Sequence, residues 1–220
     1  MVNISISNKS PSAHAGPTDS RREQIIRAAG TLFVRKGYLK TTVREIARHS
    51  GITVGTLYHY FRSKDDILSS IQEETSRFLS DLVQETGEAL SKTGSEEALR
   101  IAIEKYFSLV GNYQDITLFW YHEAGNLQPA QRKKLMRNDE LIAEAFEKIL
   151  VSGCQSGEFK PHDAKLISHD IIILGDMWAF RRWFLRKHYT LAQYIKEQTE
   201  LILSRVCIPL EMGVQHKTKG

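Results

Sequence analysis

Apolar residues recur three or four positions apart along most of the chain, the spacing that gathers them on one face of an α-helix. One such stripe runs through Ile25, Ala29 and Phe33, and another begins at Ile67 and continues to Leu82. No segment sustains the alternation of apolar and polar residues that a half-buried strand requires. The pattern predicts an all-α protein, with helices over 21–36, 43–50, 53–61, from 63 onward, and over 96–111, 114–124, 129–155, 162–187 and 191–206.

Residues that cap helices mark several of these boundaries. A hydroxyl residue three positions before an acid or amide forms the capping-box pattern, in which the hydroxyl accepts an unpaired backbone N–H of the first turn. A glycine after a cationic last turn marks a helix end, as at Gly37 and Gly51. The expected boxes are Ser20 with Glu23, Thr42 with Glu45, Ser63 with Asp66 and Thr190 with Gln193.

Charge is unevenly distributed along the chain, although the net total is only +4. Residues 20–64 carry ten Lys and Arg against Glu23 and Glu45, a net charge of +8, which leaves −4 for the remainder. A basic N-terminal segment on an acidic body is typical of a protein that binds a polyanion through that segment. The alternative is a solvated basic face with no such partner.

Residues 42–64, TVREIARHSGITVGTLYHYFRSK, hold two short helical patterns with a glycine between them. Ala47 is small enough for a second helix to cross close by, and Gly51 allows a sharp turn. Leu57 and Phe61 supply the apolar underside of that second helix. Two short helices joined in this way form a helix-turn-helix, whose second helix presents its N-terminal end to the major groove of DNA.

The same segment resembles the signature of the tetracycline-repressor (TetR) family of bacterial transcriptional regulators. The matching features are the glycine turn at Gly51, Gly-Thr-Leu-Tyr at 55–58, the aromatic pair Tyr60-Phe61 and Ser-Lys-Asp at 63–65. The resemblance implies a homodimeric, ligand-responsive regulator, expected to be a repressor, on a near-palindromic operator in double-stranded DNA. The DNA-contacting positions that it implies are Thr42, Arg44, Thr53, Val54, Gly55, Thr56, Tyr58, His59, Tyr60 and Lys64.

These positions divide by the part of DNA that each suits. Thr42 and Thr53 begin helices, where hydroxyls and free N–H groups favour phosphates. The tyrosines and Lys64 have the reach for backbone phosphates, which position a protein without reading sequence. For Tyr58 and Tyr60 the alternative is a place in the core, because only one face of a short helix meets DNA. The residues expected near base edges are Arg44, Val54, Gly55, Thr56 and His59.

The chain divides into a tail over 1–19, a helix-turn-helix DNA-binding domain over 20–66, an all-helical effector-binding and dimerisation domain over 67–210, and a tail over 211–220. The first segment is rich in Ser, Asn, Pro and Gly, which is typical of a mobile tail. No signal peptide or membrane-spanning run is recognisable. Cys154 and Cys207, without a Cys-x-x-Cys pair, fit a reducing cytoplasm.

The family resemblance implies that the body encloses an effector pocket and dimerises through its last two helices. Large apolar and aromatic side chains of the kind that line such pockets are abundant in the body. Ordinary core packing is the alternative for each of them. The candidates are Phe78, Leu82, Tyr106, Phe107, Val110, Phe119, Trp120, Tyr121, Phe146, Met177 and Trp178.

The segments Arg182-Trp183-Phe184 and Tyr189-Thr190-Leu191 are similar to those of regulators of fatty-acid or sterol degradation that sense acyl-CoA thioesters. This similarity implies a small, largely apolar effector, with an acyl-CoA thioester as the candidate. Arg181 or Arg182 would then bind CoA phosphates, for which a guanidinium fork is suited. Contacts at the rim of the dimer interface are the alternative, which we favour.

The sequence gives little support for a metal, cofactor or catalytic site. His162, Asp163, His169 and Asp170 look like a metal cluster, but the histidines lie seven residues apart on one predicted helix, so we expect no metal. We expect no cofactor, and no nucleophile, base and orienting group is recognisable. The alternative functions are a helical thioester or aromatic-compound enzyme and a nonspecific DNA-binding protein. The Gly-Thr-Leu-Tyr segment and the acidic body argue against the second.

Overall fold

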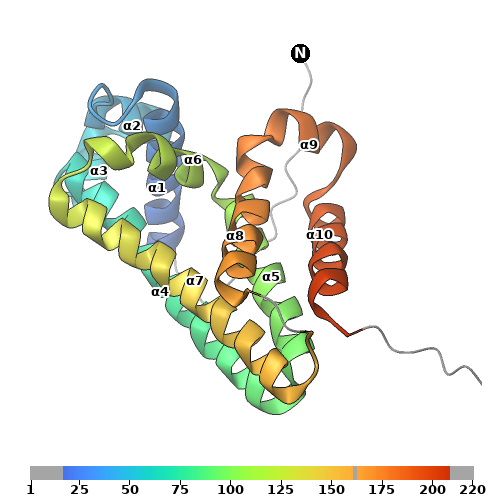
Figure 1. Ribbon diagram of the computed structural model, residues 1–220. Coiled ribbons are helices and arrows are strands. Elements are labelled where there is room, and N and C mark those ends of the chain that lie inside the picture. The colour runs from blue at the N-terminus through green and yellow to red at the C-terminus, as the bar shows by residue number, and fades with distance from the viewer. Residues whose placement is uncertain (1–16, 161–162, 209–220) are drawn as a thin grey trace, which may run out of the picture. The chain divides into compact units, whose positions relative to one another are not determined.

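The computed structural model describes residues 17–160 and 163–208, which form ten α-helices and one short 3₁₀ helix (Figure 1). These two ranges hold no strand, and one isolated antiparallel bridge joins Phe159 and Cys207. The predicted all-α class is confirmed. The helices are α1 (Pro17–Lys36), α2 (Val43–His49), α3 (Val54–Tyr60), α4 (Lys64–Thr93), α5 (Ser95–Asn112), α6 (Gln114–Glu123), η1 (Ala124–Asn126), α7 (Pro129–Ser156), α8 (Ala164–Phe180), α9 (Arg182–His188) and α10 (Leu191–Val206).

Two of the four predicted capping boxes are complete. The Thr42 and Thr190 side chains each accept the N–H three residues on, and the Glu45 and Gln193 side chains accept the cap's own N–H in return. At Ser63 only half of the box forms. Its Oγ accepts the Asp66 N–H at 3.0 Å, but the Asp66 carboxylate accepts the N–H of Arg62 at 2.8 Å.

The box predicted at Ser20 is wrong, because α1 begins three residues earlier, at Pro17. Proline is favoured at the first position of a helix, where its fixed φ suits the helix and its missing N–H is not needed. Ser20 therefore lies inside α1. The predicted tail over 211–220, most of the tail over 1–19, and His162 lie outside the described residues.

The single helix predicted over 162–187 is also wrong, since the chain breaks at Arg181 into α8 and α9. Arg181 has φ −107° and ψ 22°, outside the helical region. Contacts on both sides hold the break. The Phe180 ring packs edge-on against Tyr121 with centroids 4.7 Å apart, and Arg182 forms a 2.6 Å ion pair with Asp115 of α6.

The chain forms two compact units that divide after Leu68, within α4. In the first unit, α2 packs against both α1 and α3. Its core consists of side chains from these helices and from the start of α4, which together hold the short α2 and α3 in place. The most deeply buried are Ile25, Ile26, Ala29, Phe33, Ile46, Ala47, Leu57, Phe61, Ile67 and Leu68.

The second unit is built around α5, which packs against α7, α8 and α10. A close approach between α5 and α8 depends on Gly175. A Cβ at that position would lie 2.9 Å from the rings of Phe107 and Tyr106, so any larger residue would push the two helices apart. This approach places Asp176 of α8 beside Tyr106 of α5.

Candidate functional site

The turn between α2 and α3 is fixed by short-range contacts. Gly51 has φ +65°, in the left-handed region that glycine reaches without a steric penalty. The buried Ser50 hydroxyl donates to the Ile46 carbonyl at 2.8 Å, and Gln24 of α1 donates to the Ser50 carbonyl at 2.8 Å. These bonds fix α3 against α2, as a helix-turn-helix requires.

The residues predicted to contact DNA lie mainly on the solvent side of α2 and α3. Leu57 and Phe61 are fully buried beneath α3, whereas Tyr58 is 53% exposed, which excludes a core position for its ring. Tyr60 is half-buried, so its two alternatives stay open. The exposed members of the predicted set are Thr42, Arg44, Thr53, Gly55, Tyr58 and His59, and the partly buried members are Val54, Thr56, Tyr60 and Lys64.

Some polar side chains on this surface already form hydrogen bonds within the fold, and others do not. Thr53 caps α3, since its Oγ1 accepts the Thr56 N–H at 3.0 Å and shares a 2.8 Å hydrogen bond with the Thr56 hydroxyl. Within residues 17–160 and 163–208, the side chains of Arg44, Tyr58 and His59 have no hydrogen-bond or ion-pair partner. These three side chains are therefore available to a partner molecule.

Lys64 has a structural role that the sequence did not reveal. Its ammonium donates to the backbone carbonyls of Tyr38 at 2.6 Å and Thr41 at 3.0 Å, and it lies 4.2 Å from the centroid of the Tyr38 ring. Burial lowers the pKa of Lys64, against the opposing effect of Asp65. The predicted phosphate contact by Lys64 stays a prediction, and the lysine also ties the start of α4 to the 37–42 connection.

One of the few acids near the helix-turn-helix is already paired within the fold. Glu45 is one of two acids among residues 20–64, and it pairs with Lys36. The hydrogen bond from Lys36, with further bonds from Thr42, lowers the pKa of Glu45 to about 2. Glu45 is thereby engaged within the fold, while Arg44 beside it is unpaired within the described ranges.

The second unit contains a cavity of about 310 Å³, which we call the larger cavity because a smaller one adjoins it. Side chains from α4, α5, α6, α7 and α8 line it, and apolar groups make up most of its wall. Its size and lining are those of pockets that bind small molecules. The lining residues are Thr75, Leu79, Tyr106, Leu109, Val110, Thr117, Trp120, Tyr121, Ala124, Arg132, Leu135, Met136, Asn138, Asp139, Ile142 and Asp176.

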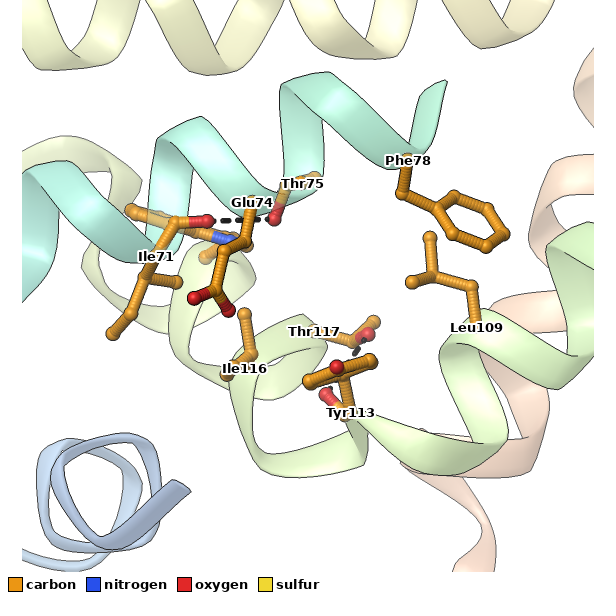
Figure 2. Close-up of a pocket in the computed structure, with 9 residues that line it drawn as sticks. Ile71, Glu74, Thr75, Phe78, Leu109, Tyr113, Ile116 and Thr117 are labelled. Carbon is orange, nitrogen blue, oxygen red and sulfur yellow. Dashed lines mark hydrogen bonds between the residues drawn. The ribbon is translucent and has the colours of Figure 1, made fainter. Parts of the chain in front are cut away.

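A smaller cavity of about 100 Å³ adjoins the larger one, and the two share Thr75, Leu109, Thr117 and Trp120 as lining residues. Figure 2 shows Phe78 of α4 and Leu109 of α5 pointing toward each other at one end of the smaller cavity. The hydroxyls of the two threonines donate to backbone carbonyls of their own helices, at 3.0 Å and 3.5 Å. The shared wall is therefore largely apolar toward both cavities.

Only part of the predicted pocket set lines these cavities. Tyr106, Val110, Trp120 and Tyr121 line the larger one, and Phe78 and Trp120 line the smaller one. The other candidates do not line either cavity, because the second unit uses them to pack its helices together. They are Leu82, Phe107, Phe119, Phe146 and Trp178, all buried, and the partly buried Met177.

The polar wall of the larger cavity is acidic, which the sequence did not predict. Asp176 is 3% exposed, and its two carboxylate oxygens accept the hydroxyls of Tyr106 at 2.9 Å and Tyr121 at 2.8 Å. Burial raises the pKa of Asp176 although both phenols stabilise its ionised form. Asp139 of α7 is open to the cavity, and burial together with the charge of Asp176 raises its pKa to about 6.

No metal site or membrane span was found in the part of the chain that the structure describes. Among those residues, no group of three or more His, Cys, Asp and Glu side chains could hold a metal ion. Asp163 instead caps α8, since its carboxylate accepts the Leu166 N–H at 3.1 Å, and His169 and Asp170 are exposed. No helix within the same residues is long and apolar enough to cross a membrane.

A helix-turn-helix with unpaired polar side chains on its outer surface, followed by a helical unit with an apolar cavity, is the architecture of a DNA-binding regulator with a separate ligand-binding unit. The chain belongs to the tetR family of bacterial regulatory proteins. The model of the family's N-terminal domain matches residues 25–71. A second model, described as a tetracyclin repressor-like C-terminal domain, matches residues 92–205. The protein is therefore a transcriptional regulator rather than the helical enzyme considered as an alternative.

Individual relatives support the same assignment. The HTH-type transcriptional regulator HbdR of Aromatoleum sp. (strain CIB) is 30% identical over 186 residues, covering 84% of this chain and 80% of the relative. The structure of the ketosteroid regulator KstR2 of Mycobacterium tuberculosis has a TM-score of 0.69 at 25% identity, covering 88% of this chain and 98% of that one. FadR of Bacillus subtilis in complex with stearoyl-CoA has a TM-score of 0.61 at 28% identity, covering 83% and 97%.

Proposed function

We propose that the protein is a ligand-responsive repressor that acts in the cytoplasm, binds a near-palindromic operator as a homodimer, and leaves it when a small, largely apolar effector binds. The observation that carries this proposal is the helix-turn-helix of the first unit, with the free Arg44, Tyr58 and His59 side chains on its surface. The larger cavity in the second unit supplies a place for the effector.

On DNA, the N-terminal end of α3 enters the major groove. The proposed base contacts come from the exposed Arg44 of α2 and from four residues of α3, which are Val54, Gly55, Thr56 and His59. The hydroxyls of Thr42, Thr53, Tyr58 and Tyr60, with the Lys64 ammonium, contact phosphates. Arg44 is the leading specificity residue, since a guanidinium suits bidentate bonding to guanine.

The dimer forms through the last two helices that the sequence predicts: 162–187, which the structure divides at Arg181 into α8 and α9, and 191–206, which corresponds to α10. Large apolar side chains are exposed on all three: Leu166 is 57% exposed on α8, Trp183 61% on α9 and Leu201 56% on α10. Exposed apolar groups of this size favour burial against a second copy. Arg181 lies against Trp183, 5.2 Å from the ring centroid, so we place it at the rim of this interface.

The effector occupies the larger cavity, and an acyl-CoA thioester is the candidate. The likeness to FadR, which binds stearoyl-CoA in its solved structure, supports that class. An effector that binds better to the conformation unsuited to DNA lowers operator affinity by linkage, and operator DNA lowers effector affinity by the same factor. Release of the operator therefore needs no contact between effector and DNA.

A footprint of the protein on the upstream DNA of its own and neighbouring genes tests the proposal. We expect protection of two half-sites in inverted repeat, with centres about 34–36 Å apart or a multiple of that distance, because a symmetric dimer presents two α3 helices. Uniform protection without a preferred sequence would support the nonspecific DNA-binding alternative instead. Protection of a single half-site would overturn the dimer.

A further inference from the structure

The two acids that line the larger cavity differ in the hydrogen bonds that their carboxyl groups accept. Asp176 is buried and holds the hydroxyls of Tyr106 and Tyr121, one on each carboxylate oxygen. Asp139 lines the same cavity, but within residues 17–160 and 163–208 its carboxyl has no hydrogen-bond or ion-pair partner. Asp139 is therefore a solvent-exposed acceptor in the lining of the cavity, available to a bound molecule.

The groups around Asp139 favour a bound molecule that donates a hydrogen bond to its carboxylate. Tyr106 from α5 and Tyr121 from α6 direct their hydroxyl protons to Asp176, so neither donates to Asp139. Asp176 from α8 adds negative charge, which acts on Asp139 across the cavity. Arg132 also lines the cavity from α7, seven residues or about two helix turns before Asp139, and the two form no ion pair.

This arrangement discriminates among the polar ends that an apolar ligand could carry. A hydroxyl or an ammonium group gives Asp139 a hydrogen bond, and bonds to a charged acceptor are stronger than bonds between neutral groups. A carboxylate offers no proton and meets two acids of its own sign. A hydrocarbon end leaves Asp139 without a partner and removes water from it, which is unfavourable for a charged group.

We propose that the larger cavity selects an apolar effector that carries a hydrogen-bond donor where it meets Asp139, with the Asp139 carboxylate as the acceptor. This inference rests on the proposed function, because it assigns the chemistry of the same effector cavity. For an acyl-CoA effector, it means an acyl group that bears a hydroxyl or amino substituent, not an unsubstituted chain. Asp176 already accepts one phenol hydroxyl on each carboxylate oxygen and is buried, so Asp139 is the more accessible acceptor of the two.

Direct binding of four matched two-ring aromatic compounds to the full-length protein, without DNA, tests the proposal by calorimetry. The probes are 2-naphthol, its methyl ether, 2-naphthoate and 2-naphthylmethylamine, which differ only in the polar end. We expect naphthol or the amine to bind about tenfold or more tightly than the ether, and naphthoate to bind weakest. If the amine binds more tightly than naphthol, the effector's donor is a cationic group. If naphthol binds more tightly than the amine, the donor is a neutral hydroxyl.

Variants at Asp139 separate this role from a merely structural one. Asp139→Leu should remove the preference for a donor while the ether still binds, and Asp139→Asn, which keeps the shape of the side chain, should remove any preference for the amine. Asp170→Asn is the matched control, because Asp170 is an exposed acid on α8 outside the lining. Its preference should equal that of the unaltered protein.

Three results would overturn the proposal: an affinity for the ether that equals or exceeds the affinities for both naphthol and the amine, tightest binding of naphthoate, or no binding of any probe at millimolar concentration. A preserved donor preference in Asp139→Leu would do the same. Because no DNA is present, these outcomes are distinct from failure of the repressor function. A donor that binds through Asp139 but leaves operator binding unchanged would contradict effector release and uphold the chemistry of the cavity.

Discussion

At the scale of single residues, two side chains that connect elements of the fold have partners far away in the chain. The Lys64 ammonium donates hydrogen bonds to the carbonyls of Tyr38 and Thr41. Asp176 accepts a hydrogen bond from the hydroxyl of Tyr106, 70 residues earlier. Composition and motif identified Lys64 and Tyr106 as candidates but not what each one contacts. The sequence shows residue types in order, whereas hydrogen bonds of this kind depend on which helices meet.

Replacement of Lys64 tests its structural role, because protein stability is measured without DNA. Lys64→Ala removes the donor from two backbone carbonyls and the cation from the Tyr38 ring, so we expect the free energy of unfolding to fall by about 1–2 kcal/mol. Urea denaturation followed by circular dichroism measures this change. Lys40→Ala is the control, because Lys40 is an exposed lysine of the same connection with no partner within the described ranges. An equal loss in both variants would contradict the structural role of Lys64.

At the scale of helices, local signals predicted the boundaries that depend on local chemistry. Thr42 and Thr190 form the expected capping boxes, and Gly37 and Gly51 take the positive φ expected after a helix end. The start at Pro17 and the break at Arg181 were missed. The break coincides with contacts from Phe180 and Arg182 to α6, which no local pattern encodes.

Replacement of two glycines by alanine is expected to change the free energy of unfolding in opposite directions. Gly51→Ala should lower the free energy of unfolding by about 1–2 kcal/mol, because its φ of +65° is strained for any residue with a Cβ. Gly87→Ala should raise it by up to about 1 kcal/mol, because Gly87 lies inside α4 with open space around a Cβ. The midpoints of urea unfolding report both changes. A stabilised Gly51→Ala would show that the turn does not depend on that conformation.

At the scale of the whole molecule, the class of protein was predictable and the detail of its cavity was not. Ten basic residues and the Gly-Thr-Leu-Tyr motif lie close together in the chain, so the DNA-binding unit could be inferred from one continuous segment. The larger cavity takes its wall from five helices, and apolar periodicity does not distinguish a side chain that lines it, such as Val110, from one that packs the core, such as Phe107. No sequence pattern distinguishes Asp139 from the other acids of α7, and only the packing of the helices brings it into the cavity lining.

The most direct test of the DNA-binding claim is an equilibrium titration of the footprinted operator with the unaltered protein, Arg44→Ala and Arg77→Ala. Arg77 is an exposed arginine of α4 without a partner within the described ranges, so its variant carries the same charge change outside the helix-turn-helix. We predict that Arg44→Ala binds the operator about 5- to 150-fold more weakly, the loss of a base contact worth about 1–3 kcal/mol, while Arg77→Ala binds as the unaltered protein does. Equal operator affinity for all three proteins would contradict the placement of the DNA-reading surface on α2 and α3.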